Sequence, residues 1–222
     1  MSIVIAVDGT AASGKGTLAK RLARHFGFAH MDSGALYRLT ALVVRDNNGD
    51  PSNEADALKG ARAIDLTRIA DPAIRSDVVG RYASQVAAIP AVRAVLHDFQ
   101  TSFLANPPGQ SLGAVMDGRD IGTVIAPNAT AKLFVDAAPE VRAHRRWLEL
   151  KSMGIAKDEA ELLAELAARD ARDGSRAVSP MKRAADAFLL DTTELDIDAA
   201  FAAALALVTP KIEDALKDRP RG

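Results

Sequence analysis

A glycine-rich stretch near the start of the chain, GTAASGKGT at residues 9–17, constrains the fold more than any other feature. It follows a short apolar run at residues 3–7, and it precedes a helical pattern in which apolar side chains recur every four positions as far as Phe26. In a strand–loop–helix unit of this kind, the backbone N–H groups of the loop can bind phosphate oxygens at the positive end of the helix. The stretch therefore predicts a phosphate-binding loop, with a glycine-rich turn that binds no ligand as the simpler alternative.

The loop departs in one place from the usual G-x-x-x-x-G-K-[ST] pattern. Lys15 is followed by Gly16, so that the hydroxyl group arrives one position later, at Thr17. Lys15 is placed to reach the β- and γ-phosphates of a nucleotide, and Thr17 is the nearest hydroxyl group for Mg²⁺. Gly16 leaves room for a partner beside the first helical turn. The spelling G-K-G-T resembles nucleoside monophosphate kinases more than motor proteins or GTPases.

Short apolar runs that alternate with helical patterns predict the fold class. The runs lie at residues 3–7, 28–31, 114–116, 132–135 and 187–190. The last three end in Asp117, Asp136 and Asp191. Alternating strands and helices favour a parallel sheet with helices on both faces, where ligands bind at the carboxyl ends of the strands. We therefore predict an α/β protein with a five-stranded parallel sheet in three layers, and the resemblance of the loop to that of nucleoside monophosphate kinases implies the P-loop kinase fold.

Two regions fit this alternation less well. Residues 46–80 are polar and interrupted by glycine and proline, which indicates a small insertion. Residues 148–180 hold a charge-dense helical segment bounded by glycine and proline, which indicates a mobile lid. Neither region is long enough for an independent domain. We predict a single domain over residues 1–222, with the insertion extending over about 39–105 and the lid over about 148–180.

Composition excludes several classes of protein. The formal net charge of the 222 residues is −1, which leaves no overall positive excess for nucleic acid or for an anionic membrane. The chain has no cysteine, so disulfides, thiolate metal sites and thiol nucleophiles are excluded. The longest apolar run, at residues 199–208, is too short to span a bilayer. We expect a monomeric cytoplasmic protein that takes small-molecule substrates and binds neither nucleic acid nor membranes.

The stretch ARDARDGSRAVSP concentrates arginines late in the chain. Its charged residues are Arg169, Asp170, Arg172, Asp173 and Arg176. On a helix that continued past Gly174, the three arginines would share one face. Transfer of a phosphoryl group concentrates negative charge that such arginines can neutralise. The alternative is a solvated face on which the two aspartates form salt bridges.

Two further motifs follow predicted strands. MDSGALYR begins with a helix-capping sequence, and its Arg38 lies in the first turns of the helix, where it could reach a bound anion. In MDGRDIGT, Asp117 ends a strand and could hold Mg²⁺ through water. Arg119 and Asp120 follow at the same edge of the sheet. They would form a local ion pair, or they would bind a phosphate and the polar edge of a base.

Five blocks of the sequence occur in the order in which bacterial cytidylate kinases carry them. They are D-G-x-x-x-S-G-K-G-T, D-S-G-A-L-Y-R, A-S-Q-V-A, D-G-R-D-I-G-T and R-D-A-R-D-G-S-R-A. The chain therefore resembles this family over nearly its whole length. The resemblance implies an enzyme that transfers the γ-phosphoryl group of ATP to CMP and to dCMP, with Mg²⁺ as cofactor. The long form of the family has a larger, strand-rich insertion where residues 46–80 stand, and this chain is shorter there.

The resemblance also implies roles for individual residues. The phosphates of ATP would be bound by Gly9, Thr10, Ala11, Ala12, Ser13, Gly14, Lys15, Gly16 and Thr17. Catalysis would depend on Lys15, Arg119, Arg169 and Arg172. CMP would be bound by Ser33, Arg38, Ser84, Arg93, Arg119, Asp120, Arg169, Asp173 and Arg176. Mg²⁺ would be held by Thr17 and Asp117, directly or through water.

A monophosphate acceptor needs no general base, because it is largely dianionic at neutral pH. The protein must instead supply positive charge and positioning. The four histidines have no metal-ligand spacing and receive no role, and Trp147 is expected to pack. Arg142, Arg145 and Arg146 are weaker candidates for the donor side, with a solvated face as the alternative. Competing functions are a kinase for AMP, UMP or a small alcohol, and a non-catalytic nucleotide sensor or ATPase.

Overall fold

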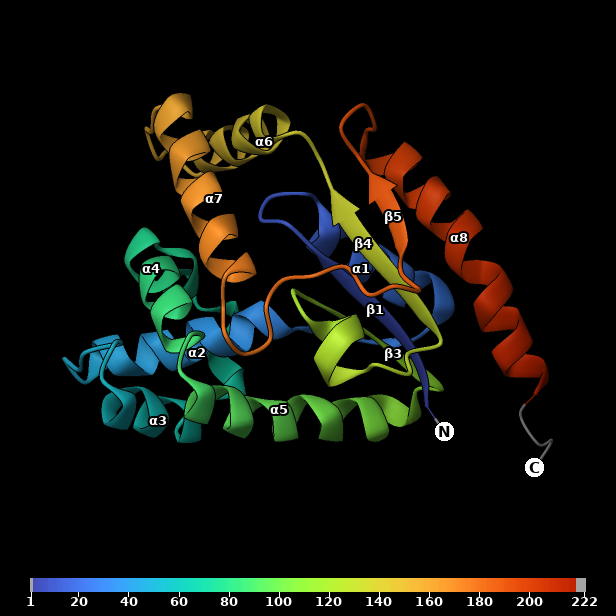
Figure 1. Ribbon diagram of the computed structural model, residues 1–222, viewed down its shortest axis with the longest axis horizontal. Coiled ribbons are helices and arrows are strands. Elements are labelled where there is room, and N and C mark those ends of the chain that lie inside the picture. The colour runs from blue at the N-terminus through green and yellow to red at the C-terminus, as the bar shows by residue number, and fades with distance from the viewer. Residues whose placement is uncertain (1, 219–222) are drawn as a thin grey trace. The chain divides into compact units, whose positions relative to one another are not determined.

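The computed structural model describes residues 2–218 and contains a five-stranded sheet in the order β2–β3–β1–β4–β5 (Figure 1). The strands are β1 Ile3–Gly9, β2 Ala29–Asp32, β3 Gly113–Gly118, β4 Ala131–Asp136 and β5 Phe188–Asp191. β1 pairs in parallel with β3 and β4, and β4 pairs in parallel with β5. Each predicted strand overlaps an observed one, and the predicted α/β fold is confirmed.

Helices connect the strands. They are α1 Lys15–Phe26, α2 Ser33–Asp46, α3 Glu54–Arg62, α4 Asp77–Val86, α5 Pro90–Ala105, α6 Pro139–Ser152, α7 Glu159–Gly174 and α8 Ile197–Lys217. Short 3₁₀ turns occur at η1 Leu66–Ala70, η2 Pro72–Arg75 and η3 Pro108–Gln110, and η4 Ile121–Ile125 is a single π-helical turn. Within residues 2–218, none of these helices is long and apolar enough to cross a membrane.

The chain divides into two compact units, which are described separately. The sheet unit comprises the described residues of 1–31 and 104–222, and the helical unit comprises residues 32–103. The sheet unit therefore contains the glycine-rich loop, the sheet, and helices α1, α6, α7 and α8. The helical unit contains α2, α3, α4 and most of α5.

One face of β1 builds the hydrophobic core of the sheet unit. Ile3, Ile5 and Val7 alternate along the strand and pack with apolar residues of α1 and α8, such as Leu22 and Val208. Successive side chains of a strand point to opposite faces, so the residue after Val7 points away from this core. That residue is an aspartate, and the following glycine opens the loop, so the alternation itself places charge at the carboxyl end of β1.

The helical unit has a small apolar core between α2, η2 and α4. Leu39 and Leu42 of α2 pack with Ile74 and Val79. Side-chain caps fix where the helices begin: Asp32 accepts a hydrogen bond from Ala35 N, which confirms the predicted cap of α2, and further caps begin α3 and α4. Residues 46–80, all of them described, form helices and turns without a strand.

Helix α7 ends at Gly174, one of the glycines that bound the helical segment in the sequence. The condition for a shared face of the three arginines, a helix that continues past Gly174, is therefore not met, and Arg176 lies outside the helix that carries Arg169 and Arg172. The chain turns back because Met181 N donates to Asp173 O at 2.8 Å. The turn begins at Gly174, and glycine disfavours continuation of a helix because it loses more backbone entropy there than other residues do.

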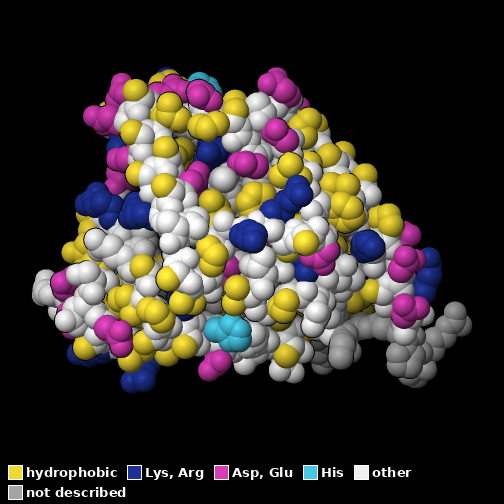
Figure 2. Space-filling view, viewed as in Figure 1, with side chains coloured by type: hydrophobic (Ala, Val, Ile, Leu, Met, Phe, Trp, Pro, Cys, Tyr) yellow, Lys and Arg dark blue, Asp and Glu magenta, His cyan; other side chains and the backbone are white. Residues whose placement is uncertain are grey.

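Positive and negative side chains are mixed on one face of the molecule (Figure 2). On the face drawn in Figure 2, Lys and Arg side chains alternate with Asp and Glu side chains rather than forming one stripe. This mixture agrees with the net charge of −1, so that any anion must be bound by a local cluster of positive side chains.

Candidate active site at the carboxyl edge of the sheet

The glycine-rich loop leaves the sheet at Gly9, which no other residue could replace without a shift of the backbone. A Cβ atom there would lie 1.9 Å from Val135 O on the neighbouring strand, and Gly9 has φ +149°. Ala12 and Gly14 also have positive φ values, 59° and 87°. Such left-handed turns direct successive N–H groups toward one point, as an anion site requires. All nine predicted ATP-binding residues, Gly9 to Thr17, thus lie in this loop and the first turn of α1.

Lys15 begins α1 and spans the loop. Its Nζ atom donates a hydrogen bond to Thr10 O at 3.1 Å, so the ammonium group lies against the start of the loop. Ser13, fully buried, donates to the same carbonyl oxygen at 3.0 Å. The loop is therefore held closed by its own side chains, and the ammonium charge is placed beside N–H groups that favour an anion.

A carboxylate approaches the first turn of α1 where the sequence has Gly16. A Cβ atom at Gly16 would lie 3.4 Å from Asp117 Oδ2. The other oxygen of Asp117, Oδ1, lies 2.8 Å from Nε2 of His30, which the sequence left without a role. Thr17 is exposed in the same turn. A hydroxyl and one carboxylate suit Mg²⁺, which usually binds few protein ligands and takes its other ligands from phosphate and water. Within residues 2–218, no cluster of three His, Cys, Asp or Glu residues is arranged to hold a metal ion.

Asp8 fixes the segment that follows β3, and sequence reasoning missed it. Its carboxylate is 4% exposed and accepts hydrogen bonds from Ile121 N at 2.8 Å and Gly122 N at 2.7 Å. Burial raises the pKa of Asp8 to about 6, although these two hydrogen bonds and the Lys15 charge oppose the rise. The negative charge of Asp120 adds to it. The only sequence signal was the position of an acidic residue at the end of a buried strand.

Arg119 links the loop to helix α7. Its Nη1 donates to Gly9 O at 2.7 Å, and its Nε donates to Asp173 Oδ2 at 2.8 Å. Arg176 donates to the other oxygen of Asp173. Asp173 is 2% exposed, so the predicted alternative of a solvated salt-bridge face is wrong for this residue. Burial alone would raise the pKa of Asp173, but the charges of Arg119 and Arg176 outweigh it and hold the pKa below its usual range.

The two other predicted arginines of α7 differ from each other. Arg169 is partly buried, and its charge helps to lower the pKa of Asp173. Arg172 is exposed, and its Nε donates to Ala168 O of its own helix at 3.3 Å. The structure therefore brings Arg119 and Arg176 into contact with Asp173 and leaves Arg172 on the solvent side.

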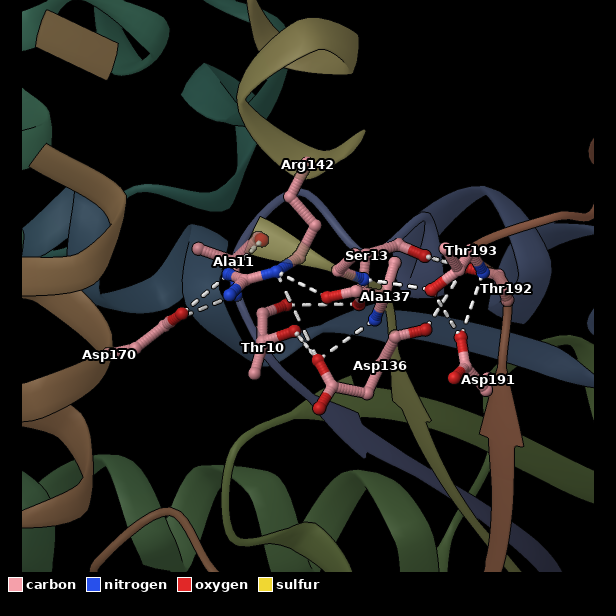
Figure 3. A network of polar contacts seen from close by, with 12 residues as sticks. Thr10, Ala11, Ser13, Asp136, Ala137, Arg142, Asp170, Asp191, Thr192 and Thr193 are labelled. Carbon is pink, nitrogen blue, oxygen red and sulfur yellow. Dashed lines mark hydrogen bonds and ion pairs between the residues drawn. The ribbon is translucent and has the colours of Figure 1, made fainter. Parts of the chain in front are cut away.

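The outer side of the loop is held by side chains from the ends of β4 and β5 and from α6 (Figure 3), of which the sequence left only Thr192 unnoticed. Asp136, at the end of β4, accepts a hydrogen bond from Thr10 Oγ1 at 2.6 Å. Thr192, just after β5, donates through Oγ1 to Ser13 O at 3.1 Å. Arg145 of α6 donates to that same hydroxyl at 3.0 Å. Asp136 ends β4 as predicted, and its observed contact there is a loop hydroxyl.

Arg142 and Arg146 show that the arginines of α6 are not equivalent. Arg142 is 6% exposed, so the solvated-face alternative is wrong for it, and it bonds Ala11 O, Ala137 O and Asp170. Arg146 instead pairs with Glu149 on its own helix at 2.7 Å.

The helical unit holds the remaining predicted site residues. Arg38 donates to Ile74 O at 2.7 Å, and its guanidinium lies beside Gly80, whose absent Cβ atom would meet it at 3.6 Å. Ser84, on the same helix as Gly80, donates to Gly80 O at 3.4 Å. The unit thus places Arg38 and Ser84 around one glycine of α4.

Arg93 and Ser33 complete this set within the helical unit. Arg93 lies near the ring of Tyr37, with 5.5 Å between its Cζ atom and the ring centroid, and donates to Ala87 O at 3.3 Å. Ser33 begins α2 and is buried. Trp147, in the sheet unit, stacks on His144 with 5.7 Å between ring centroids, as its predicted packing role requires.

Comparison with known proteins places the chain in a family. Residues 5–210 match the sequence profile of the family described as cytidylate kinase. The cytidylate kinase of Rhodopseudomonas palustris (strain TIE-1) is 53% identical over 206 residues, which cover 93% of this chain and 95% of that protein. The cytidylate kinase of Afipia carboxidovorans is 52% identical over 206 residues, covering 93% and 97%.

Solved structures with low sequence identity share the fold alone. A gluconokinase from Sinorhizobium meliloti 1021 has a TM-score of 0.51 at 14% identity, and the match covers 98% of each chain. An uncharacterized protein from Eubacterium ventriosum has a TM-score of 0.54 at 15% identity, covering 94% of this chain and 99% of that one. With a profile match over most of its length and relatives at half identity, the chain belongs to the cytidylate kinase family.

Proposed function

We propose that this protein transfers the γ-phosphoryl group of ATP to CMP, giving ADP and CDP, and that it also accepts dCMP. The observation that carries the proposal is the loop itself: an ammonium group lies against its start, and an arginine bound to its first carbonyl is held by a buried aspartate. This concentrates positive charge where a phosphoryl group would be transferred. Membership of the cytidylate kinase family supports the choice of acceptor.

The reaction joins an oxygen of the CMP phosphate to Pγ of ATP while the bond from Pγ to the bridging oxygen of ADP breaks. The acceptor oxygen is already ionised, so no side chain needs to remove a proton from it. The obstacle is repulsion between two anions. Lys15 and the loop N–H groups hold the donor phosphates, and Arg119 and Arg169 offset charge on the transferred group.

Mg²⁺ is the cofactor we propose, with Thr17 and Asp117 as the residues that would hold it, directly or through water. The exposed hydroxyl and the carboxylate beside Gly16 fit a hard cation that also binds phosphate oxygens. When bound, Mg²⁺ would neutralise phosphate charge. His30 would orient the carboxylate of Asp117 through the contact at its Oδ1 atom.

For the acceptor, we propose roles residue by residue. In the helical unit, Arg38 binds the CMP phosphate, Ser33 and Arg93 bind cytosine, and Ser84 lies near the ribose. In the sheet unit, Arg119 binds the phosphate, Asp120 binds cytosine, and Arg169 and Asp173 lie near the ribose. Arg172 and Arg176 belong to the lid. The buried positions of Ser33, Arg93 and Asp120 support selective polar contacts, because buried polar groups discriminate strongly between bases.

Residues 148–180 are proposed to act as the lid over ATP, and the helical unit as the acceptor-binding insertion. The contacts of Asp173 and Asp170 with the loop side of the sheet unit support this, since they give α7 a defined resting place at the donor site. A distance between labels on residues 161 and 20 that stayed constant on adding both nucleotides would count against closure.

One measurement tests the proposed reaction. ADP release is followed with ATP, Mg²⁺ and each nucleoside monophosphate in turn, and products are separated to confirm CDP. We expect CMP and dCMP to give the highest kcat/KM. A higher kcat/KM for AMP would overturn the assignment to cytidylate, and ADP release that does not depend on any acceptor would favour an ATPase or sensor.

A further inference from the structure

Arg142 lies at a junction of three elements of the sheet unit (Figure 3). Its Nε atom donates to Ala137 O at 2.9 Å, just after β4. Its Nη1 atom donates to Ala11 O in the loop at 3.2 Å and to Asp170 Oδ2 of α7 at 2.5 Å. A planar guanidinium presents donors at fixed angles, so these three bonds fix the relative positions of their partners.

Asp170 completes the link from the side of α7. Its Oδ1 atom accepts a hydrogen bond from Ala11 N at 3.2 Å, while Oδ2 accepts from Arg142. Both backbone polar groups of Ala11 are therefore bound by one ion pair: the carbonyl by Arg142 and the N–H by Asp170. Loss of either partner of such an ion pair is costly, because it leaves the charge of the other partner uncompensated in a largely buried place.

A second ion pair repeats the arrangement nearby. Arg119 binds a loop carbonyl, that of Gly9, and pairs with Asp173 of α7. Asp170 and Asp173 are three residues apart, so they lie on one side of the helix. Helix α7 thus contacts the loop twice through the same motif, an arginine that joins a loop carbonyl to an α7 aspartate. The Arg119–Asp173 pair consists of proposed substrate-binding residues, whereas Arg142 and Asp170 have no role in the proposed reaction.

We propose that Arg142 and Asp170 are a positioning pair that sets the distance between the phosphate loop and the arginines of α7. Arg169 precedes Asp170 directly, so fixing Asp170 on Ala11 also fixes Arg169 relative to the donor phosphates. The Arg119–Asp173 pair must exchange contacts when its members bind CMP. The Arg142–Asp170 pair keeps α7 on the loop during that exchange. This inference rests on the proposed phosphoryl transfer.

The test is a double-mutant cycle with Arg142→Met, Asp170→Asn and the double variant. Asparagine keeps an oxygen for Ala11 N–H and nearly the same shape, so it removes the ion pair with little change in packing. Arg142→Lys is the conservative variant, since it keeps the charge but loses the bond to Ala137 O. The matched control is a second cycle on the ion pair between Lys217 and Asp214 of α8, 3.1 Å apart and outside the proposed lid, with Lys217→Met and Asp214→Asn.

Two readouts distinguish positioning from folding. We expect each single variant at the pair to lower kcat roughly 10- to 100-fold, as a small misplacement does, and the double variant to be no slower than Arg142→Met. We also expect more than one ADP per CDP, because a displaced α7 would let water compete with CMP for the γ-phosphoryl group. Loss of folded protein would lower ADP and CDP together. The control cycle should keep one ADP per CDP, and Arg142→Lys should fall between Arg142→Met and the parent protein.

The inference is overturned if both single variants still form one ADP per CDP, or if their effects on kcat multiply in the double variant. Circular dichroism and thermal melts establish that each variant is folded, and Arg142→Lys remains a test if Asp170→Asn does not fold. If the parent protein forms no CDP at all, the proposed function fails instead, and the two failures are thereby distinguished.

Discussion

The sheet unit and the helical unit hold their charged groups in different ways. In the sheet unit, Asp8, Asp173 and Arg142 are buried and bonded to partners far away in the sequence. In the helical unit, many side-chain hydrogen bonds are local: Asp65 caps Thr67, and Asn53 caps Ala55. Buried networks are costly to rearrange, whereas short helices with exposed caps open at low cost. We infer that the loop at the donor edge is pre-formed and that the helical unit adapts more readily than this edge does.

The largest effect should come from removing the charge at the centre of the donor edge. Lys15→Met should lower kcat by about 100- to 1,000-fold, as loss of one preorganised donor to developing charge does, with the melting temperature little changed. Lys20→Met is the matched control, because Lys20 is an exposed lysine of the same helix. Steady-state kinetics and thermal melts measure both. A Lys15→Met protein with the kcat of its parent would show that the loop is not the donor site.

Asp8 offers a test of burial at the same edge. Its pKa is raised from 3.8 to about 6, so the folded protein binds this proton more tightly than the unfolded chain does. The stability due to Asp8 is therefore present at low pH and is lost as pH rises through about 6. Asp8→Asn removes this dependence. The parent-minus-variant difference in unfolding free energy should fall by up to about 3 kcal/mol between pH 4 and 7, measured by urea denaturation.

Asp65 provides the control of opposite sign in the helical unit. Hydrogen bonds from the side chain and backbone of Thr67 lower the pKa of this exposed carboxyl. Its stabilising contribution is therefore present above the ordinary pKa of an aspartate and is lost as pH falls. Asp65→Asn should show the reverse trend to Asp8→Asn, and with a smaller amplitude. If the parent-minus-variant difference in unfolding free energy did not change with pH for either variant, the contrast between the two units would be contradicted.

Arg38 tests the acceptor side alone. Arg38→Gln removes a charged donor that we propose binds the CMP phosphate, so KM for CMP should rise roughly 10- to 100-fold. KM for ATP should change by less than about twofold, since uniform loss of acceptor binding leaves donor contacts intact. Arg75→Gln is the control, because Arg75 is an exposed arginine of the same unit. Equal increases in both KM values would contradict a division between donor and acceptor units.

The sequence allowed local features to be predicted and left the long-range ones undetermined. Helix α1 was predicted with its observed bounds, Lys15–Phe26, because its apolar spacing and the left-handed cap at Gly27 are local signals. The loop was predicted because its residues are contiguous. The bonds from Thr10 to Asp136 and from Arg142 to Ala11 join residues more than 120 positions apart, and only the register of the sheet brings them together.

For several charged residues, the residue type alone did not indicate the role, because the surrounding tertiary structure determines it. A charged helix face is more often solvated than buried, so Asp173 and Arg142 resembled surface charges in the sequence. His30 had no metal-ligand spacing, but its partner is a carboxylate from a neighbouring strand. Arg176 would share a face with Arg169 and Arg172 only on a longer helix, and α7 ends two residues before it. In each case the missing information was a tertiary contact that no spacing rule contains.

The smallest effect we expect comes from a cap in the helical unit, and it tests whether that unit opens on its own. Asn53 accepts hydrogen bonds from Ala55 N at 2.9 Å and Asp56 N at 3.2 Å at the start of α3. Asn53→Ala should lower local stability by about 1 kcal/mol. Amide exchange should then quicken in α3 and its neighbours of the helical unit while the sheet unit keeps its protection, and KM for CMP should rise slightly without a change in KM for ATP. Ser52→Ala, one residue earlier, is the control. If exchange quickened equally in β1 and β4, the two units would unfold together, and the adaptability of the acceptor side would need another cause.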